Sequence, residues 1–75
     1  DVVSSKFDQT CKLYNLTVRE MEIVKLILKG STYKMIGKTL FISGRTVTKH
    51  VENIFEKMGV ANKVELINRL RVNPD

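Results

Sequence analysis

The stretch Ser43–Gly59, SGRTVTKHVENIFEKMG, reads as one amphipathic helix with its own start and stop signals. Ser43 can accept hydrogen bonds from the first free amides, and Gly59 can adopt the left-handed conformation just past the end. Four apolar residues recur at spacings of four, three and four, which places them on one stripe: Val47, Val51, Ile54 and Met58. The sequence therefore predicts a helix with one side packed on a small core and the other side exposed.

A short connection joins this helix to the one before it. The preceding helix is expected to start near residues 31–32 and to run to about Leu40, which leaves only the tripeptide FIS between the two. Helices joined by so short a turn cross steeply, as in a helix-turn-helix arrangement. Phe41 and Ile42 are apolar, which indicates that the turn itself is anchored in the core.

Gly37 lies in the middle of this shorter helix, and two interpretations stay open. Glycine inside a helix costs roughly 1 kcal/mol relative to alanine, so the residue can be a tolerated weak point. It can equally allow another helix to cross closely. Three apolar residues of the same helix are expected to face the core, namely Met35, Ile36 and Leu40, and Thr39 is a further candidate.

Two further helices flank this pair. Thr17 and Glu20 form a capping box that starts the first helix, and Gly30 ends it. The buried face of this helix is expected to contain four apolar residues: Ile23, Val24, Ile27 and Leu28. Asn62 can cap the last helix, which is expected over about residues 63–70.

Residues 1–15 contain polar clusters and no sustained period, so a flexible linker or arm is expected there. The sequence thus predicts an all-α fold in three parts: the arm at 1–15, a four-helix domain at 16–72 and a tail at 73–75. Because the chain does not begin with Met, we expect either a processed protein or, as the favoured interpretation, a fragment of a longer one, in which case a sensing or oligomerising domain is expected before Asp1.

Length and composition exclude several classes of protein. Seventy-five residues fit one domain, whose core is too small for a deep catalytic cleft. Thirteen Lys and Arg against eight Asp and Glu give a formal charge of +5, which favours a polyanionic partner. Cys11 is the only cysteine, so an internal disulfide and a cysteine-based zinc site are excluded. The sequence contains no membrane span or signal peptide, and the cytoplasm is the expected compartment.

Catalytic chemistry has little support in the sequence. His50 is the only histidine, and no Asp or Glu is placed to form a triad with it. The glycines form no loop that could cradle a phosphate. We therefore expect a half-buried structural role for His50, with a phosphate or backbone hydrogen bond as the second interpretation. No enzyme activity, metal ion or cofactor is expected.

Nucleic-acid binding fits the pattern better, because an exposed helix and positive charge coincide. The major groove of DNA admits an α-helix, and side chains near the helix start reach the base edges. On the helix that begins after Ser43, the candidates are Arg45, Thr48, Lys49 and Glu52. Lysine can donate to guanine, threonine can contact a thymine methyl group and glutamate can accept from cytosine N4. A merely solvated face is the alternative.

Candidate phosphate contacts lie at the starts of the two helices, since free amides and the helix dipole favour anions there. They are Thr32, Tyr33 and Lys34 at the first start, and Ser43, Arg45 and Thr46 at the second. For Tyr33, partial packing in the core is an equal contender. Three further lysines either extend this patch or only solubilise the surface: Lys38, Lys57 and Lys63.

Three motifs occur at a specific spacing: LTVRE at 16–20, ISGRTVTKHV at 42–51 and KMGV at 57–60. Together they resemble the LuxR-type DNA-binding domain, also called NarL/FixJ-type, from Leu16 to about Leu70. The resemblance implies a four-helix domain whose second and third helices form the helix-turn-helix. It also implies a bacterial transcriptional regulator, often activated through a phosphorylated receiver or a ligand-binding domain on the N-terminal side.

Site residues follow from the resemblance position by position. It implies base reading by Thr48, Lys49 and Glu52, and it places Thr46 near phosphate and Val47 in the core. It also implies that the last helix mediates dimerisation, through Val64, Ile67 and Leu70. Three residues depart from the family pattern: Thr48 and Glu52 stand where cations occur, and Gly37 stands where alanine is usual.

The expected function is sequence-specific binding of double-stranded operator or promoter DNA by a homodimer, with the helix at about residues 44–58 in the major groove. RNA polymerase is a further candidate partner. The alternative is an interaction module that keeps the helix-turn-helix shape but contacts another protein, which Glu52 and Glu56 on the exposed face make conceivable. The salt dependence of duplex binding distinguishes the two hypotheses.

Overall fold

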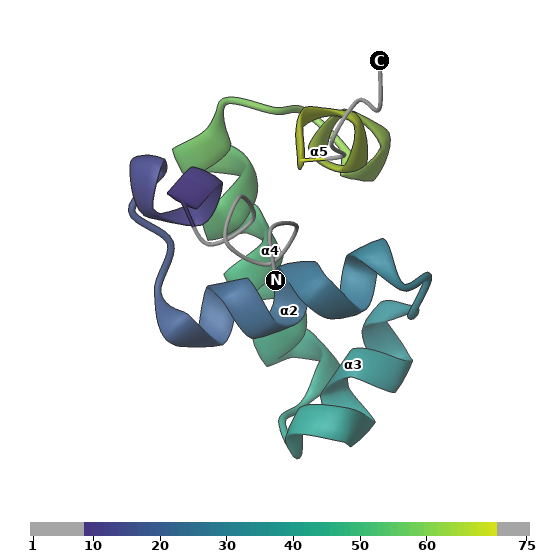
Figure 1. The fold of residues 1–75 in the computed structure, drawn as a ribbon. Helices are drawn as coiled ribbons and strands as arrows, with labels where there is room; N and C mark the ends of the chain where they lie inside the picture. The colour runs from purple at the N-terminus through teal and green to yellow at the C-terminus, as the bar shows by residue number, and fades with distance from the viewer. Residues whose placement is uncertain (1–8, 71–75) are drawn as a thin grey trace.

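The computed structural model describes residues 9–70, and every regular element within this range is a helix. Figure 1 labels four of them: α2 is Val18–Leu28, α3 is Tyr33–Leu40, α4 is Gly44–Met58 and α5 is Lys63–Leu70. Residues 9–13 form a further short helix ahead of α2. The predicted all-α fold with a helix-turn-helix at α3 and α4 is confirmed.

The helices α2, α3 and α4 each begin where the sequence supplies a cap. The Glu20 amide donates to Thr17 Oγ1 at 3.1 Å, and the Thr17 amide donates to Glu20 Oε1 at 2.9 Å, which completes the capping box of α2. Thr32 and Ser43 cap α3 and α4, each accepting a hydrogen bond from the amide three residues further on. Gly59 ends α4 in the left-handed conformation with φ of 68°.

The core lies between α2, α3 and α4, and α5 joins it through α2. The apolar stripe of α4 is buried as predicted: Val47, Val51, Ile54 and Met58. It belongs to one cluster with residues of the other helices: Ile23, Val24, Ile27, Ile36 and Leu66. In Figure 1, α2 crosses in front of α4. The core therefore covers one side of α4 and leaves the opposite side open.

Three apolar residues expected in the core lie partly or wholly outside it. Phe41 is 93% exposed, because it ends α3 in the left-handed conformation, with φ of 60°. Met35 is 53% exposed, because its neighbour Ile36 is the residue of α3 that points into the core and is fully buried. Leu28 is the last residue of α2 and is also exposed. The turn is thus attached to the core through the half-buried Ile42 and not through Phe41.

Residues 9–13 are helical where the sequence indicated no regular element. Cys11 is completely buried in this segment, and Asn15 follows with a left-handed φ of 59° that leads into the buried Leu16. A helix this short offers no apolar period to detect, which is why the prediction missed it. The remaining residues of the expected arm, 1–8, and the expected tail, 73–75, lie outside the described residues.

Gly37 marks the closest approach between α3 and the turn. A Cβ atom at this position would lie 2.7 Å from the Ile42 carbonyl oxygen and 3.6 Å from Val47 Cγ2. The Ile42 amide in turn donates to the Gly37 carbonyl at 2.9 Å. Of the two interpretations of this glycine, the close crossing is the one that the structure supports.

Candidate nucleic-acid interface

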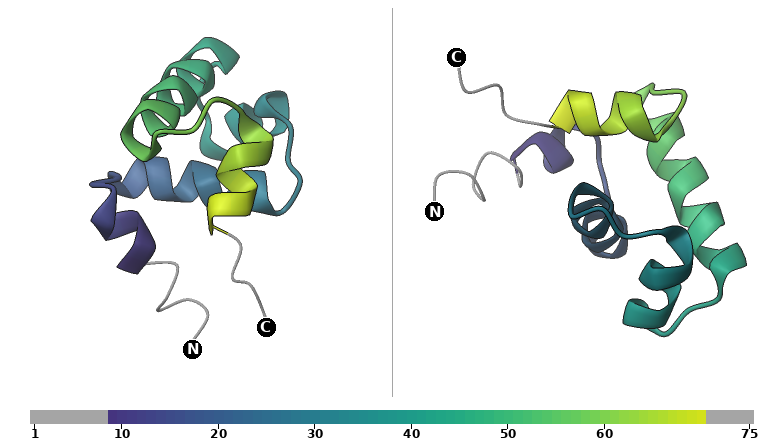
Figure 2. Two further views of the ribbon diagram at one scale, coloured as in Figure 1. Left: turned by 90° about the horizontal axis from the view of Figure 1, so that it is seen from above. Right: turned by 90° about the vertical axis from the view of Figure 1, so that its right-hand side faces the viewer.

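The open side of α4 forms one continuous strip of exposed polar side chains. At about 100° per residue, Arg45, Thr48, Lys49 and Glu52 fall within roughly 100° around the helix axis and about 10 Å along it. All four are exposed. Figure 2 shows α4 along one edge of the molecule, with none of the described helices lying over this edge. The structure therefore brings the predicted base-reading residues together on an accessible surface, which we call the α4 strip.

Ser43 and Thr46 are linked at the start of α4. The Thr46 amide donates to Ser43 Oγ at 3.1 Å, and the two hydroxyl oxygens lie 2.9 Å apart. One hydroxyl proton serves the contact between them, so the other remains available to a phosphate oxygen. Arg45 is exposed between the two. The three predicted phosphate contacts at this helix start therefore lie together.

The other predicted phosphate contacts, Thr32, Tyr33 and Lys34, lie at the start of α3. Thr32 is exposed and caps the helix, and Lys34 is exposed beside it. Tyr33 is packed against the core, and burial raises the pKa of its hydroxyl group. The Lys63 ammonium group, from the start of α5, lies 5.3 Å from the centre of the Tyr33 ring, a cation–π distance. Tyr33 thus packs through its ring, while Lys63 brings another positive charge to the start of α3.

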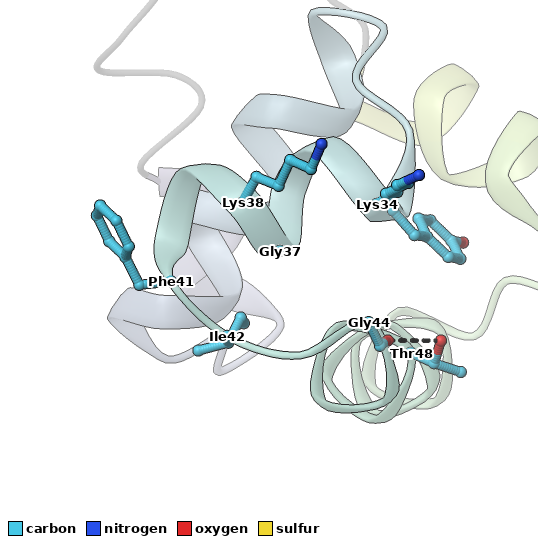
Figure 3. Close-up of a pocket in the computed structure, with 8 residues that line it drawn as sticks. Lys34, Gly37, Lys38, Phe41, Ile42, Gly44 and Thr48 are labelled. Atoms are coloured by element: carbon cyan, nitrogen blue, oxygen red, sulfur yellow. Dashed lines mark hydrogen bonds between the residues drawn. The ribbon is translucent and has the colours of Figure 1, made fainter.

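A hollow of about 670 Å³ opens between α3 and the start of α4 (Figure 3). Six of the residues that line it are Lys34, Gly37, Lys38, Phe41, Ile42 and Thr48. Lys38, whose role the sequence left open, therefore shares this hollow with Lys34. The apolar character of Phe41 did not indicate that it is a surface residue. Its position directly after α3, where a left-handed residue commonly ends a helix, was the available signal.

Lys57 supports the fold, which is a role that the sequence did not indicate. Its ammonium group donates to Glu20 Oε1 at 2.8 Å and to the Asn15 carbonyl oxygen at 3.2 Å. It thereby joins the end of α4 to the start of α2 and to the segment before it. His50 is half-buried beside the apolar stripe of α4, where the sequence predicted it.

The three residues expected to mediate dimerisation differ in their exposure. Val64 is 65% exposed, Ile67 is half-buried and Leu70 is buried at 7% exposure. Leu66 is fully buried and belongs to the core. The core of the single chain therefore takes up Leu66 and Leu70 and packs against part of Ile67, which leaves Val64 as the exposed apolar side chain of α5.

Two other kinds of feature were sought in the part of the chain that the structure describes. No group of three or more His, Cys, Asp or Glu residues in this part could hold a metal ion. None of its helices is long and apolar enough to cross a membrane. The surface around α4 offers cations, hydroxyl groups and helix-start amides, which are the groups that proteins use on phosphates and base edges.

Comparison with known proteins finds one matching family model, described as bacterial regulatory proteins, luxR family, over residues 14–70. The chain is 42% identical over 55 residues to the transcriptional regulatory protein DegU of Brevibacillus brevis, an overlap of 73% of this chain and 23% of DegU. It is 45% identical over 51 residues to the transcriptional regulatory protein LiaR of Bacillus subtilis, an overlap of 68% and 24%. No solved structure shows significant similarity to the chain.

The relatives differ in how much of their length the chain covers. It spans 23% to 31% of the first two curated relatives that it matches. The spore germination protein GerE of Bacillus subtilis is 38% identical over 55 residues, and there the overlap is 73% of this chain and 74% of GerE. The similarity thus covers a domain that occurs both inside longer proteins and as most of a short one.

Proposed function

The chain belongs to the luxR family of bacterial regulatory proteins, and on this basis we propose that it binds double-stranded DNA sequence-specifically as the DNA-binding part of a transcriptional regulator. The names of DegU and LiaR as transcriptional regulatory proteins support this function. The formal charge of +5 favours a polyanion such as DNA.

The observation that carries the proposal is the α4 strip, which stands open between candidate phosphate contacts at two helix starts. In the proposed complex, α4 enters the major groove and its first turns meet the base edges. Lys49 donates to guanine O6 or N7, and Glu52 accepts from cytosine N4. Phosphates bind at the two helix starts, where the contacts are Thr32, Tyr33 and Lys34 on α3 and Ser43, Arg45 and Thr46 on α4.

Dimerisation through α5 completes the proposal. A symmetric dimer places its two α4 helices in successive major grooves, about 34 Å apart on one side of the duplex. Val64 and Ile67 provide the apolar contact, because Val64 is exposed and Ile67 is only partly covered by the core of the single chain. RNA polymerase is the further partner that we propose for a regulator bound at a promoter.

The test begins with duplexes selected from random DNA and footprinted to locate the half-sites. Affinities of the wild type, Lys49→Ala and Glu52→Ala are then measured on the selected duplex and its single-base variants. Lys49→Ala is expected to lower affinity by about tenfold through the loss of one base contact. Glu52→Ala is expected mainly to relax the preference at one base pair. Unchanged binding by both variants would contradict the assignment of the α4 strip.

Lys12→Ala is the matched control for Lys49→Ala. Lys12 is also exposed, but it lies in the helical segment at residues 9–13, away from the start of α4 (Figure 2). Removal of the same charge at this position is expected to leave the affinity for the selected duplex within about twofold of the wild-type value, because distant exposed charges are largely screened. A loss equal to that of Lys49→Ala would mean that only overall charge matters.

A protein-interaction module is the second candidate, and the exposed Glu52 and Glu56 on α4 favour it. Salt separates the two functions, because each neutralised phosphate contributes about −0.9 to the slope of log affinity against log salt. A DNA-binding domain is expected to give a slope of several units. No duplex binding at low salt would point to the interaction module.

A further inference from the structure

Thr48 has its hydroxyl group occupied within the helix. Thr48 Oγ1 donates to the Gly44 carbonyl oxygen at 3.1 Å, one turn earlier. Figure 3 shows this bond, with the hydroxyl turned to Gly44 and the methyl group turned away from it. A threonine can form such a bond in a helix because one of its side-chain rotamers brings the hydroxyl to the carbonyl four residues back. The proton that could have donated to a base is used inside the protein.

With its proton donated to Gly44, the Thr48 hydroxyl can only accept a hydrogen bond, and the methyl group is the apolar part of the side chain. The residue is exposed on the α4 strip, in the first turns of the helix, where side chains reach base edges. In the major groove the apolar feature of a base pair is the C5-methyl group of thymine. A methyl group held outward by an internal hydrogen bond can contact that group without losing a hydrogen bond of its own.

The surroundings of Thr48 suit one strand of a duplex. Thr48 lines the hollow between α3 and α4 together with Gly37 and Ile42, which present little polar surface beyond the backbone. Lys34 and Lys38 also belong to the lining of this hollow, and in the view of Figure 3 the Lys38 side chain extends away from Gly44 and Thr48. A nucleotide with its base against Thr48 would therefore have cations in the lining of the same hollow to hold the phosphates of the same strand.

We infer that Thr48 is a specificity residue that reads the C5-methyl group of one thymine in each half-site, through its own methyl group and not through its hydroxyl. The inference rests on the proposed DNA binding and assigns a chemical preference to one position of it. It predicts that the selected half-site contains a thymine whose contribution to the binding affinity comes from its C5-methyl group.

The experiment removes that methyl group from the DNA and from the protein separately. Each thymine of the selected half-site is replaced in turn by uracil, which lacks only the C5-methyl group. Each duplex is titrated with the wild type, Thr48→Ser and Thr48→Val. Serine keeps the hydroxyl and loses the methyl group, whereas valine keeps a methyl group and loses the hydroxyl. Because Thr48 is exposed, all three proteins are expected to fold alike, and circular dichroism checks this.

For the wild type, uracil at one position is expected to lower affinity about three- to fivefold, as for one buried methyl group, and to have little effect elsewhere. Thr48→Ser is expected to bind the thymine and uracil duplexes equally at that position. Thr48→Val is expected to keep the discrimination.

Two results overturn the inference, and they differ from a failure of DNA binding. Tight binding with no uracil-sensitive position that depends on Thr48 would contradict methyl reading and leave the proposed function intact. Loss of affinity in Thr48→Val with full affinity in Thr48→Ser would assign the reading to the hydroxyl. If none of the proteins binds any duplex, the proposed function fails and this inference fails with it.

Discussion

Glu20 is a charged residue at the edge of the core, with only 3% of its surface exposed. Burial raises the pKa of its carboxyl group, but hydrogen bonds from the Lys57 ammonium group and the Thr17 amide outweigh this effect. The pKa of Glu20 therefore lies below its ordinary value. Ionised Glu20 stabilises the folded chain at neutral pH, and acid removes this stabilisation.

Replacement of Glu20 by glutamine should show this pH dependence. Glutamine retains a capping-box side chain but carries no charge, so Glu20→Gln is expected to lose about 1 kcal/mol at pH 7. Since the folded pKa is lowered, the difference is fully present above the unfolded glutamate pKa of about 4.3 and shrinks as the pH falls through the folded value. Urea titrations of both proteins between pH 7 and pH 2 measure it. A difference that stays constant with pH would contradict the ionic account.

Phe41 combines almost complete exposure with a left-handed backbone, which is unfavourable for any residue with a Cβ atom. Phe41→Gly is therefore expected to be more stable than Phe41→Ala by about 1 kcal/mol, because both lose the ring but only glycine relieves the backbone. Thermal unfolding of the two variants tests this. If alanine equals glycine, the left-handed conformation of residue 41 is not maintained in solution.

At the scale of the elements, the decisive contact is the crossing of α3 by the turn that leads into α4. The Ile42 carbonyl oxygen approaches Gly37 so closely that a Cβ atom would lie 2.7 Å from it. The turn backbone cannot move aside alone, because Ser43 in the same segment caps α4. The position of α4 on the core is therefore coupled to the size of residue 37.

Gly37→Ala is expected to destabilise the fold by about 1 kcal/mol. Alanine gains roughly 1 kcal/mol of helix propensity, but overpacking against backbone costs about 1–3 kcal/mol. DNA affinity is expected to fall as well, because the start of α4 must shift. Chemical denaturation and duplex titration measure the two effects.

Thr39→Ala provides the control for this prediction, since residue 39 is exposed on the same helix. It should gain a few tenths of a kcal/mol from helix propensity alone and leave DNA affinity unchanged. If Gly37→Ala raises the free energy of unfolding as much as Thr39→Ala does, the close approach of the Ile42 carbonyl oxygen to residue 37 does not constrain the fold.

The helices themselves were predictable from local signals, whereas several contacts were not. Helix starts are indicated by Thr17, Thr32 and Ser43, because a capping residue bonds to amides close to it in the sequence. The apolar stripe that includes Val47 likewise indicates the buried side of α4. Residues 9–13 gave no such signal. The exposure of Phe41 follows from a backbone conformation that the apolar character of the residue conceals.

The candidate site was predictable to a similar extent. Helical spacing was sufficient to place Thr48, Lys49 and Glu52 on one face, since exposure follows from the angle to the apolar stripe. The bond from Thr48 to Gly44 depends on a rotamer, and the ties from Lys57 to Glu20 and Asn15 join residues more than thirty positions apart, as their separations of 37 and 42 show. Sequence spacing cannot indicate contacts of these kinds.

At the scale of the whole molecule, Val64 provides the test of the proposed dimer. Because its side chain is 65% exposed, Val64→Glu is expected to change the stability of the single chain by less than about 0.5 kcal/mol. Like charges across the symmetric interface are expected to abolish cooperative binding to a duplex with two half-sites and to leave binding to one half-site unchanged. Gel-shift titrations on both duplexes measure this.

Val18→Glu is the matched control, since it adds the same charge at an exposed valine of α2, outside the proposed dimer contact. It separates a general effect of negative charge on DNA binding from an effect on the dimer contact. Cooperative binding that survives Val64→Glu would exclude this surface as the interface.

The two ends of the described chain lie on the side of the molecule away from the turn between α3 and α4, as both views of Figure 2 show. A group attached at either end would therefore not clash with a duplex bound at α4. Such a group could be a fluorescent dye, a solid support or a second domain. The domain is therefore suited to protein fusions: it can be joined at both ends to other segments of a synthetic protein as an exchangeable DNA-binding module. The binding measurements proposed above can be made by immobilising it at either end.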